Sequence, residues 1–248
     1  SLAIGIPAVE SRLVLPLEAS MLARTEEPVD ISGDAYGVLY VLQKDGKVIR
    51  IGNEGSTMKV STQYADLSDD QTDLTIGYSA IAFHPEFLAK ERPGFGKFYV
   101  VSAERTRSSM PDLIPEFGFG PEHHQDVIYE YQTDFPQASN FKGERREVMR
   151  FSQPGPNNNV SSLAFTQLGH LFIAVGDGAD DEVDNRSPSK NASSLANVYG
   201  KVLRVDPMGR NSVNGKYGIP KTNPFQLVSN ALPELWAFGL RAPLSLSC

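Results

Sequence analysis

A repeated pair of short apolar segments constrains the fold of this chain more than any other feature. Residues 80–83 read Ala-Ile-Ala-Phe and are followed, after a turn, by Gly-Lys-Phe-Tyr-Val at residues 96–100. Residues 162–165 read Ser-Leu-Ala-Phe and are followed by Gly-His-Leu-Phe-Ile at residues 169–173. Gly, Asp, Asn and Pro separate such runs, and long amphipathic patterns are scarce. The sequence therefore predicts an all-β chain built from repeated units.

A third copy of the repeat lies near the start of the chain. Tyr40, Tyr99 and Phe172 hold the same place in the three copies, roughly 60 to 70 residues apart. A further strand follows each of them. In the first copy the pair Asp45 and Gly46 separates two β-rich runs, which is a strong signal for a tight hairpin turn. Repeats of this size, with about four short strands each, are typical of β-propeller blades.

The repeats define how the chain is organised. Residues 242–247 look like the first strand of another blade, whose hairpin partner is not in the chain. We therefore predict a partial β-propeller of about three to three and a half blades over residues 28–248. Residues 1–27 are expected to form a separate segment that could supply a ring-closing strand. A β-sandwich with chance similarity between its hairpins is the alternative fold.

The composition excludes several classes of protein. The 248 residues carry 30 acidic and 23 basic side chains, for a formal net charge of −7, and Lys and Arg do not cluster. Nucleic acid is therefore not an expected partner. No apolar run approaches ~18 residues, so we expect no membrane span. The single cysteine, Cys248, cannot form an intrachain disulfide, and no signal peptide is visible.

Several unrelated motifs follow one another in a specific order and spacing. They are Asn-Ala-Ser-Ser-Leu at 191–195, Gly-Lys-Val-Leu-Arg-Val-Asp-Pro at 200–207, Ile-Pro-Lys-Thr-Asn-Pro-Phe at 219–225 and Glu-Leu-Trp-Ala-Phe-Gly-Leu-Arg at 234–241. Residues 81–87 and 171–178 fit the same pattern. On these residues the chain closely resembles the soluble PQQ-dependent glucose/sorbosone dehydrogenase family, which also includes hedgehog-interacting-protein-like domains.

The resemblance implies a fold, ligands and a location. The family has a six-bladed propeller, of which this chain would form the N-terminal half. Its active members oxidise the C1 hydroxyl of aldoses or similar sugars with pyrroloquinoline quinone (PQQ) and calcium. The implied partners are therefore a sugar or another small molecule, with PQQ and calcium as cofactors. The resemblance also implies a secreted or periplasmic protein.

The chain departs from the family's site in two places. Counting back from residues 163–165, the His that serves as the family's general base falls on Asn158. A carboxamide cannot accept a proton at neutral pH, so Asn158 is predicted to be inactive as a base. Arg241 matches the family's cofactor-contacting Arg, whereas the Asn that follows it is replaced by Ala242. We assign no metal ligand, because the segment that supplies the calcium ligands follows this point in the family.

Two groups of polar residues could bind a metal. The loop 177–185 is rich in carboxylates, which calcium prefers, but its spacing does not match a helix-loop-helix calcium loop. A solvated acidic loop is the favoured interpretation. His123 and His124, near Asp126, are interpreted as a solvated pair whose side chains point to opposite faces of a strand.

Three further charged residues have alternative interpretations. Glu104 and Asp177 follow equivalent strands, so both could face the top of the propeller channel, although a pair of solvated loop acids is the favoured interpretation. Arg241 could bind an anionic cofactor through its planar guanidinium, or it could cap a contact between blades.

These observations leave three classes of function open. The first is a PQQ-dependent sugar dehydrogenase, as a fragment or a degenerate member of the family. The second is a non-catalytic propeller module that binds a glycan or a protein. The third is a metal-dependent, lactonase-like propeller enzyme. Because the unpaired last strand would leave an open edge, a homodimer in which two chains complete one ring is a further prediction.

Overall fold

The computed structural model describes residues 23–54, 58–70, 75–106, 111–113, 123–178 and 188–248. Their strands form three four-stranded antiparallel sheets, which we call blades 1 to 3, and within each blade the strands lie in chain order. Residues 1–22 of the predicted N-terminal segment lie outside the described residues. The short helical elements are the 3-10 helix η1 (Leu67–Asp70) and α1 (Pro188–Ser193). Blade 1 contains β1 (Pro28–Gly33), β2 (Leu39–Gln43), β3 (Lys47–Glu54) and β4 (Met58–Asp66), blade 2 contains β5 (Thr75–Phe83), β6 (Lys97–Glu104), β7 (His124–Gln132) and β8 (Glu144–Gln153), and blade 3 contains β9 (Val160–Phe165), β10 (Leu171–Val175), β11 (Lys201–Val205) and β12 (Leu235–Phe238).

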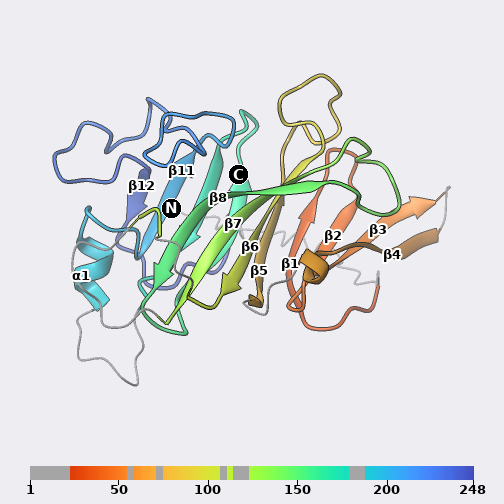
Figure 1. Cartoon of the computed structure of the whole chain (residues 1–248), viewed down its shortest axis with the longest axis horizontal. Coiled ribbons are helices and arrows are strands. Elements are labelled where there is room, and N and C mark those ends of the chain that lie inside the picture. The colour runs from red at the N-terminus through yellow and green to blue at the C-terminus, as the bar shows by residue number, and fades with distance from the viewer. Residues whose placement is uncertain (1–22, 55–57, 71–74, 107–110, 114–122, 179–187) are drawn as a thin grey trace, which may run out of the picture.

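The first strand of each blade is the innermost one. β1 packs against β5, and β5 packs against β9, so the blades follow one another from the orange to the blue part of the chain (Figure 1). The fourth strands β4, β8 and β12 lie at the opposite edges of their sheets. Antiparallel sheets arranged in this way are the blades of a β-propeller. The prediction of an all-β chain with about three blades is confirmed, and the sandwich alternative is not observed.

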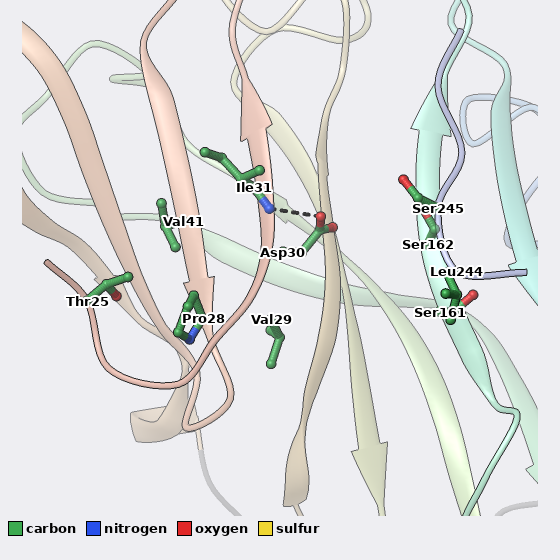
Figure 2. Close-up of a pocket in the computed structure, with 10 residues that line it drawn as sticks. All are labelled: Thr25, Pro28, Val29, Asp30, Ile31, Val41, Ser161, Ser162, Leu244 and Ser245. Atoms are coloured by element: carbon green, nitrogen blue, oxygen red, sulfur yellow. Dashed lines mark hydrogen bonds between the residues drawn. The ribbon is translucent and has the colours of Figure 1, made fainter. Parts of the chain in front are cut away.

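Residues 242–247 do not form the strand that the sequence predicts. They run beside β9, where Ser161 Oγ donates to the Pro243 carbonyl and the Leu246 amide donates to Ser162 Oγ at 3.1 Å. Figure 2 shows this segment next to β9. Each of these contacts uses a side chain of β9, whereas a strand requires a ladder of main-chain hydrogen bonds. The segment therefore occupies the place of a fourth inner strand without pairing as one.

Blade 2 is buried on both faces. Phe98 and Val100 of β6 pack toward blade 1, whereas Tyr99 and Val101 pack toward blade 3, because successive side chains of a strand alternate between its faces. All four side chains are buried. This two-sided burial explains why the second strand of the repeat reads as a continuous apolar run.

Stacked aromatic rings join blade 1 to blade 2. Tyr40 of β2 stacks on Phe83 of β5, with 4.1 Å between the ring centroids. Phe83 stacks on Phe98 at 5.2 Å, and Phe98 stacks on Tyr131 of β7 at 5.1 Å. Such pairs add to the stabilisation that comes from burial of the rings. The aromatic residue that marks the first copy of the repeat is therefore a packing residue between blades.

A cluster of charged residues joins blade 2 to blade 3. Glu130 of β7 accepts hydrogen bonds from Arg146 at 2.8 and 2.7 Å and from the hydroxyl of Tyr99. Arg146 also donates to the carbonyls of Pro207 and Lys216, in the segment that follows β11. Burial opposes the charged form of Glu130, but the bonds from Arg146 and Tyr99 outweigh it and hold the pKa of Glu130 below its ordinary value. The buried carboxylate is thus fully paired, and its partner reaches across to the next blade.

Polar side chains also connect the inner strands. Asp30 Oδ2 on β1 accepts the Ile81 amide of β5 at 2.8 Å, and Ser79 Oγ on β5 donates to the Val160 carbonyl of β9 at 2.9 Å. Asp30 lies in a cavity of about 500 Å³ between β1, β9 and the end of the chain (Figure 2). Burial raises the pKa of Asp30 above its ordinary value, although two amides donate to it. These bonds fix the position of each inner strand relative to the next.

Candidate functional site

A second cavity, of about 400 Å³, lies between the inner strands where β9 begins. We call it the inner cavity. Asn158 and Ala242 both line it, although they come from distant parts of the sequence. The two positions at which the chain departs from the family's site therefore share one cavity. Asn159 and Gly176 complete the wall on the side of blade 3.

Asn158 is held as a hydrogen-bond donor in this cavity. Its backbone is left-handed, with a φ of 55°, a conformation that Asn tolerates better than most residues. Its Nδ2 donates to Asp177 Oδ1 at 3.1 Å, and its carbonyl accepts the Gly178 amide at 3.2 Å. Gly176 packs so closely that a Cβ added there would lie 2.3 Å from the Asn158 carbonyl oxygen. The side-chain amide of Asn158 is thereby held against a carboxylate.

Asp177 connects Asn158 to Arg241. The Asp177 amide donates to the Arg241 carbonyl at 2.8 Å, while its side chain accepts from Asn158. Asp177 is 1% exposed, so the interpretation of this residue as a solvated loop acid is wrong. The Arg241 side chain is exposed. The structure thus brings the two predicted site residues, Asn158 and Arg241, within one hydrogen bond of the same aspartate.

Sequence reasoning missed one residue of this group. Asn191 Nδ2 donates to the Asp177 carbonyl at 2.9 Å. Asn191 begins one of the motifs that carry the family resemblance, and that motif was the available signal. Its spacing from Asp177 gives no indication of contact, because Asn191 lies in α1 and Asp177 follows β10.

Glu104 lies elsewhere and belongs to blade 2. It accepts hydrogen bonds from the Tyr129 hydroxyl at 2.7 Å and from Arg150 at 3.1 Å, and both Glu104 and Arg150 are buried. Burial and the neighbouring Glu104 carboxylate raise the pKa of Tyr129 well above its ordinary value. The interpretation of Glu104 as a solvated loop acid is therefore wrong: the residue forms a buried ion pair within its own sheet.

The interpretation of the histidine pair as solvated is wrong for His124. This residue is 3% exposed, and its Nδ1 lies 2.9 Å from His123 Nδ1, so the rings meet instead of pointing to opposite faces. On the other side, His124 Nε2 lies 3.2 Å from Asn159 Nδ2 and 3.4 Å from Asp126 Oδ1. The cause is that His124 is the first residue of β7 and is covered by the turn that leads into blade 3. The buried imidazole supports the wall of the inner cavity through Asn159.

The metal-binding interpretation of the acidic loop stays a prediction. Residues 179–185 of this loop lie outside the described residues. Within the part of the chain that the structure describes, no group of three or more His, Cys, Asp or Glu side chains is placed to hold a metal ion.

Comparison with known proteins identifies the family. The family model described as Glucose / Sorbosone dehydrogenase matches residues 25–248. The chain belongs to this family. HIPL2 protein of Arabidopsis thaliana is 28% identical over 224 residues, and Hedgehog-interacting protein of Homo sapiens is 29% identical over 225 residues. The solved PQQ-bound form of Aldose Sugar Dehydrogenase from Streptomyces coelicolor matches with a TM-score of 0.55 at 18% identity.

These members of the glucose/sorbosone dehydrogenase family are longer than the present chain. The matches cover 77% of this chain and 31% of HIPL2, and 86% of this chain and 28% of Hedgehog-interacting protein. The match to the Streptomyces coelicolor structure covers 88% of this chain and 52% of that one. The chain thus spans less than a third of the length of these two curated relatives. At 18% identity the structural likeness supports the propeller fold alone.

We expect Gly176→Ala to destabilise the protein. The new Cβ would meet the main chain of Asn158, which cannot move without breaking its bond to Gly178, so the free energy of unfolding should fall by about 1–3 kcal/mol. Urea unfolding measures this change. Gly33→Ala is the matched control, because its Cβ would make only ordinary contacts at 3.6 Å or more. Equal stabilities of the two variants would contradict the packing described for the inner cavity.

Proposed function

We propose that this chain forms part of a PQQ-binding, sugar-recognising site in which oxidation of the sugar is weak or absent. One observation carries the proposal: an amide that donates to Asp177 stands where the family resemblance requires a proton acceptor. Membership of the glucose/sorbosone dehydrogenase family supports the cofactor and the substrate class. The PQQ-bound state of a structural neighbour supports the same choice of cofactor.

The residues present fit the anionic part of PQQ. The cofactor is a flat tricarboxylate, and the guanidinium of an arginine has a fork that matches a carboxylate. Arg241 is an exposed residue next to Ala242, which lines the inner cavity. The described part of the chain places no group of three or more His, Cys, Asp or Glu side chains around a common point. We therefore assign Arg241 a role in holding the cofactor and assign no residue to a metal.

The chain's own residues explain why the reaction would be slow. PQQ, when bound, supplies a quinone that accepts two electrons from an alcohol. Removal of the hydroxyl proton needs a general base, which typically contributes 10²–10⁴-fold to a rate. The carboxamide of Asn158 can orient a hydroxyl group but cannot take its proton at neutral pH. The bond to Asp177 holds the carboxamide in place and so favours binding over proton transfer.

A non-catalytic binding module is the second candidate. The same hydrogen-bonded amide favours it, and so does the match to Hedgehog-interacting protein, whose name describes an interaction and no reaction. In this case the inner cavity and the surface around it would bind a glycan or a protein and catalyse no reaction.

Location and assembly are part of the proposal. We infer a secreted or periplasmic protein from the resemblance to the family. Among the described helices, none has the length and apolar character needed to cross a membrane. A homodimer that completes the ring is supported by Trp236 and Phe238 of β12, which are exposed, whereas Leu235 of the same strand is buried in the core that blade 3 shares with blade 2. Measurement of the solution mass tests it, with a mass near 27.1 kDa as the contradicting result.

We expect Arg241→Gln to weaken PQQ binding by about 10- to 100-fold, because the variant loses a charge-assisted pair with a carboxylate. Titration of the protein with PQQ, followed by the shift in the cofactor's absorption spectrum, measures the affinity. Arg92→Gln is the control, since Arg92 is an exposed arginine that pairs with Glu86. Absence of any shift with the wild-type protein, or equal affinities of the two variants, would overturn the role of Arg241.

We expect Asn158→His to raise sugar oxidation by about 10²-fold or more, because the imidazole restores a proton acceptor at the position of the missing base. The assay follows dye reduction with aldoses in the presence of PQQ and Ca²⁺. Asn158→Ala is the control and should stay at the wild-type level or below it. If the His and Ala variants had the same rate, Asn158 would not occupy the position of the base.

A further inference from the structure

Lys201, the first residue of β11, is a buried cation that has no part in the proposed function. Its side chain is 0% exposed. Its Nζ donates to the main-chain carbonyls of Asn191 at 2.8 Å and Ala192 at 3.0 Å, and to the carbonyl of Tyr199. An ammonium group has three N–H donors, so these three carbonyls satisfy it completely. Carbonyl oxygens of α1 and of the turn before β11 thus surround a charge that belongs to the chain itself.

The first carbonyl leads from Lys201 to the side of the inner cavity that holds Asn158. Asn191 accepts from Lys201 through its main chain, and through its side chain it donates to the Asp177 carbonyl at 2.9 Å. Asp177 in turn accepts from Asn158. The position of the ammonium group is therefore two hydrogen-bonded residues away from Asn158.

The second carbonyl leads to the segment that carries Arg241. The Ala192 carbonyl accepts both from Lys201 and from the Gly239 amide, the latter at 2.9 Å. Gly239 directly follows β12 and lies two residues before Arg241. The Gly200 amide donates to the Gly176 carbonyl at 2.9 Å, which ties the start of β11 to the wall of the inner cavity as well.

We propose that Lys201 is the positioning residue of the inner cavity: its ammonium group fixes the carbonyls of Asn191 and Ala192, and these set Asp177 and Arg241 in their relative places. An ammonium suits this task because three acceptors from separate turns converge on one charge, much as they would on a metal ion. An apolar side chain would leave the same carbonyls without this donor. The effect of Lys201 on PQQ binding rests on the proposed function, whereas its effect on the positions of Asp177 and Arg241 does not.

The charge state of Lys201 provides an independent readout. Burial lowers the pKa of Lys201 to about 8. Among the described charged side chains near Lys201 in the chain or its hydrogen-bond network are Asp177, Glu234 and Arg241, and the direct contacts of Nζ are uncharged carbonyls. Since the unfolded chain holds this proton up to a higher pH than the folded chain, the contribution of Lys201 to global stability rises from pH 8 toward pH 10.5. Over the same range the amine loses one N–H donor, so local order around Asn191 and Ala192 falls while global stability rises.

Site-resolved hydrogen exchange tests the proposal without any ligand. We expect Lys201→Met to increase exchange of the Asp177 and Gly239 amides at least tenfold relative to the Thr133 amide of blade 2. Tyr217→Phe is the matched control for general destabilisation of blade 3, because it removes one buried hydrogen bond to Glu234. In the control, the exchange rates of the Asp177 and Gly239 amides, each divided by the rate of the Thr133 amide, should change by less than threefold. Equal changes in both variants would show that Lys201 is merely structural and would overturn the proposal.

A second variant separates the connection through Asn191 to Asp177 from the connection through Ala192 to Gly239. It also provides a test if Lys201→Met does not fold. Asn191→Ala removes the side-chain bond to Asp177 but keeps the Ala192 carbonyl, so exchange should increase at Asp177 and stay unchanged at Gly239. No change at Asp177 would overturn the proposal. In the wild-type protein the Asp177 ratio, corrected for intrinsic exchange, should rise with a midpoint near pH 8. A flat profile would contradict the role of the charge.

PQQ titration then connects the geometry to the proposed function. If wild-type protein binds PQQ, Lys201→Met should bind it about tenfold more weakly, whereas Tyr217→Phe should match wild type. Failure of the wild type to bind PQQ would overturn the proposed function and leave the exchange result to decide the role of Lys201. Unchanged PQQ affinity in Lys201→Met would overturn its role in positioning Arg241.

Discussion

The contacts between neighbouring inner strands are the constraint on which the rest of the structure depends. The backbone groups of β5 and β9 that face their neighbours would be costly to bury without partners. Asp30 accepts the Ile81 amide of β5, and Asp126 Oδ2 accepts the Val160 amide of β9 at 2.9 Å, so a carboxylate from the preceding blade satisfies each one. Each bond joins a carboxylate of one blade to the inner strand of the next blade, with Asp30 on β1 and Asp126 on β7. These bonds determine where β9 begins and hence where the inner cavity lies.

The inner cavity differs from an ordinary loop cluster because its polar residues are tied to one another around the buried Asp177. Asn158, Asp177 and the Arg241 main chain form a continuous chain of hydrogen bonds, supported from below by the ammonium of Lys201. Buried polar networks of this kind specify one geometry when all their members are paired. We propose that this network keeps a binding geometry, while the Asn158 carboxamide stands where the family resemblance requires the base.

The repeat made the fold predictable, because local sequence determines the alternation and the turns. The Asp45 and Gly46 pair forms the predicted hairpin turn, with a φ of 96° at Gly46, and the aromatic markers fall on equivalent strands. The end of the chain was less predictable. Residues 242–247 have the sequence of a strand but do not form one. A strand needs main-chain hydrogen bonds to a second strand, and the local sequence does not reveal whether these form.

The site was predictable only in part, for a related reason. The motifs predict Asn158 and Arg241 as site residues. In the structure Asp177 connects the Asn158 side chain to the Arg241 main chain. Glu104, His124 and Asp177 were interpreted as solvated because each stands at the end of a strand. Their partners come from other strands or from the next blade, as Arg150, Asn159 and Asn158 show. A local pattern cannot reveal burial that arises from contacts with distant segments of the chain.

A difference electron-density map from crystals of the protein soaked with PQQ and Ca²⁺ tests the central claim most directly. The account predicts PQQ over the inner cavity, with a carboxylate within hydrogen-bond distance of the Arg241 guanidinium and the ring system next to Asn158. An empty inner cavity at a saturating concentration of PQQ, or PQQ bound away from Arg241, would contradict it.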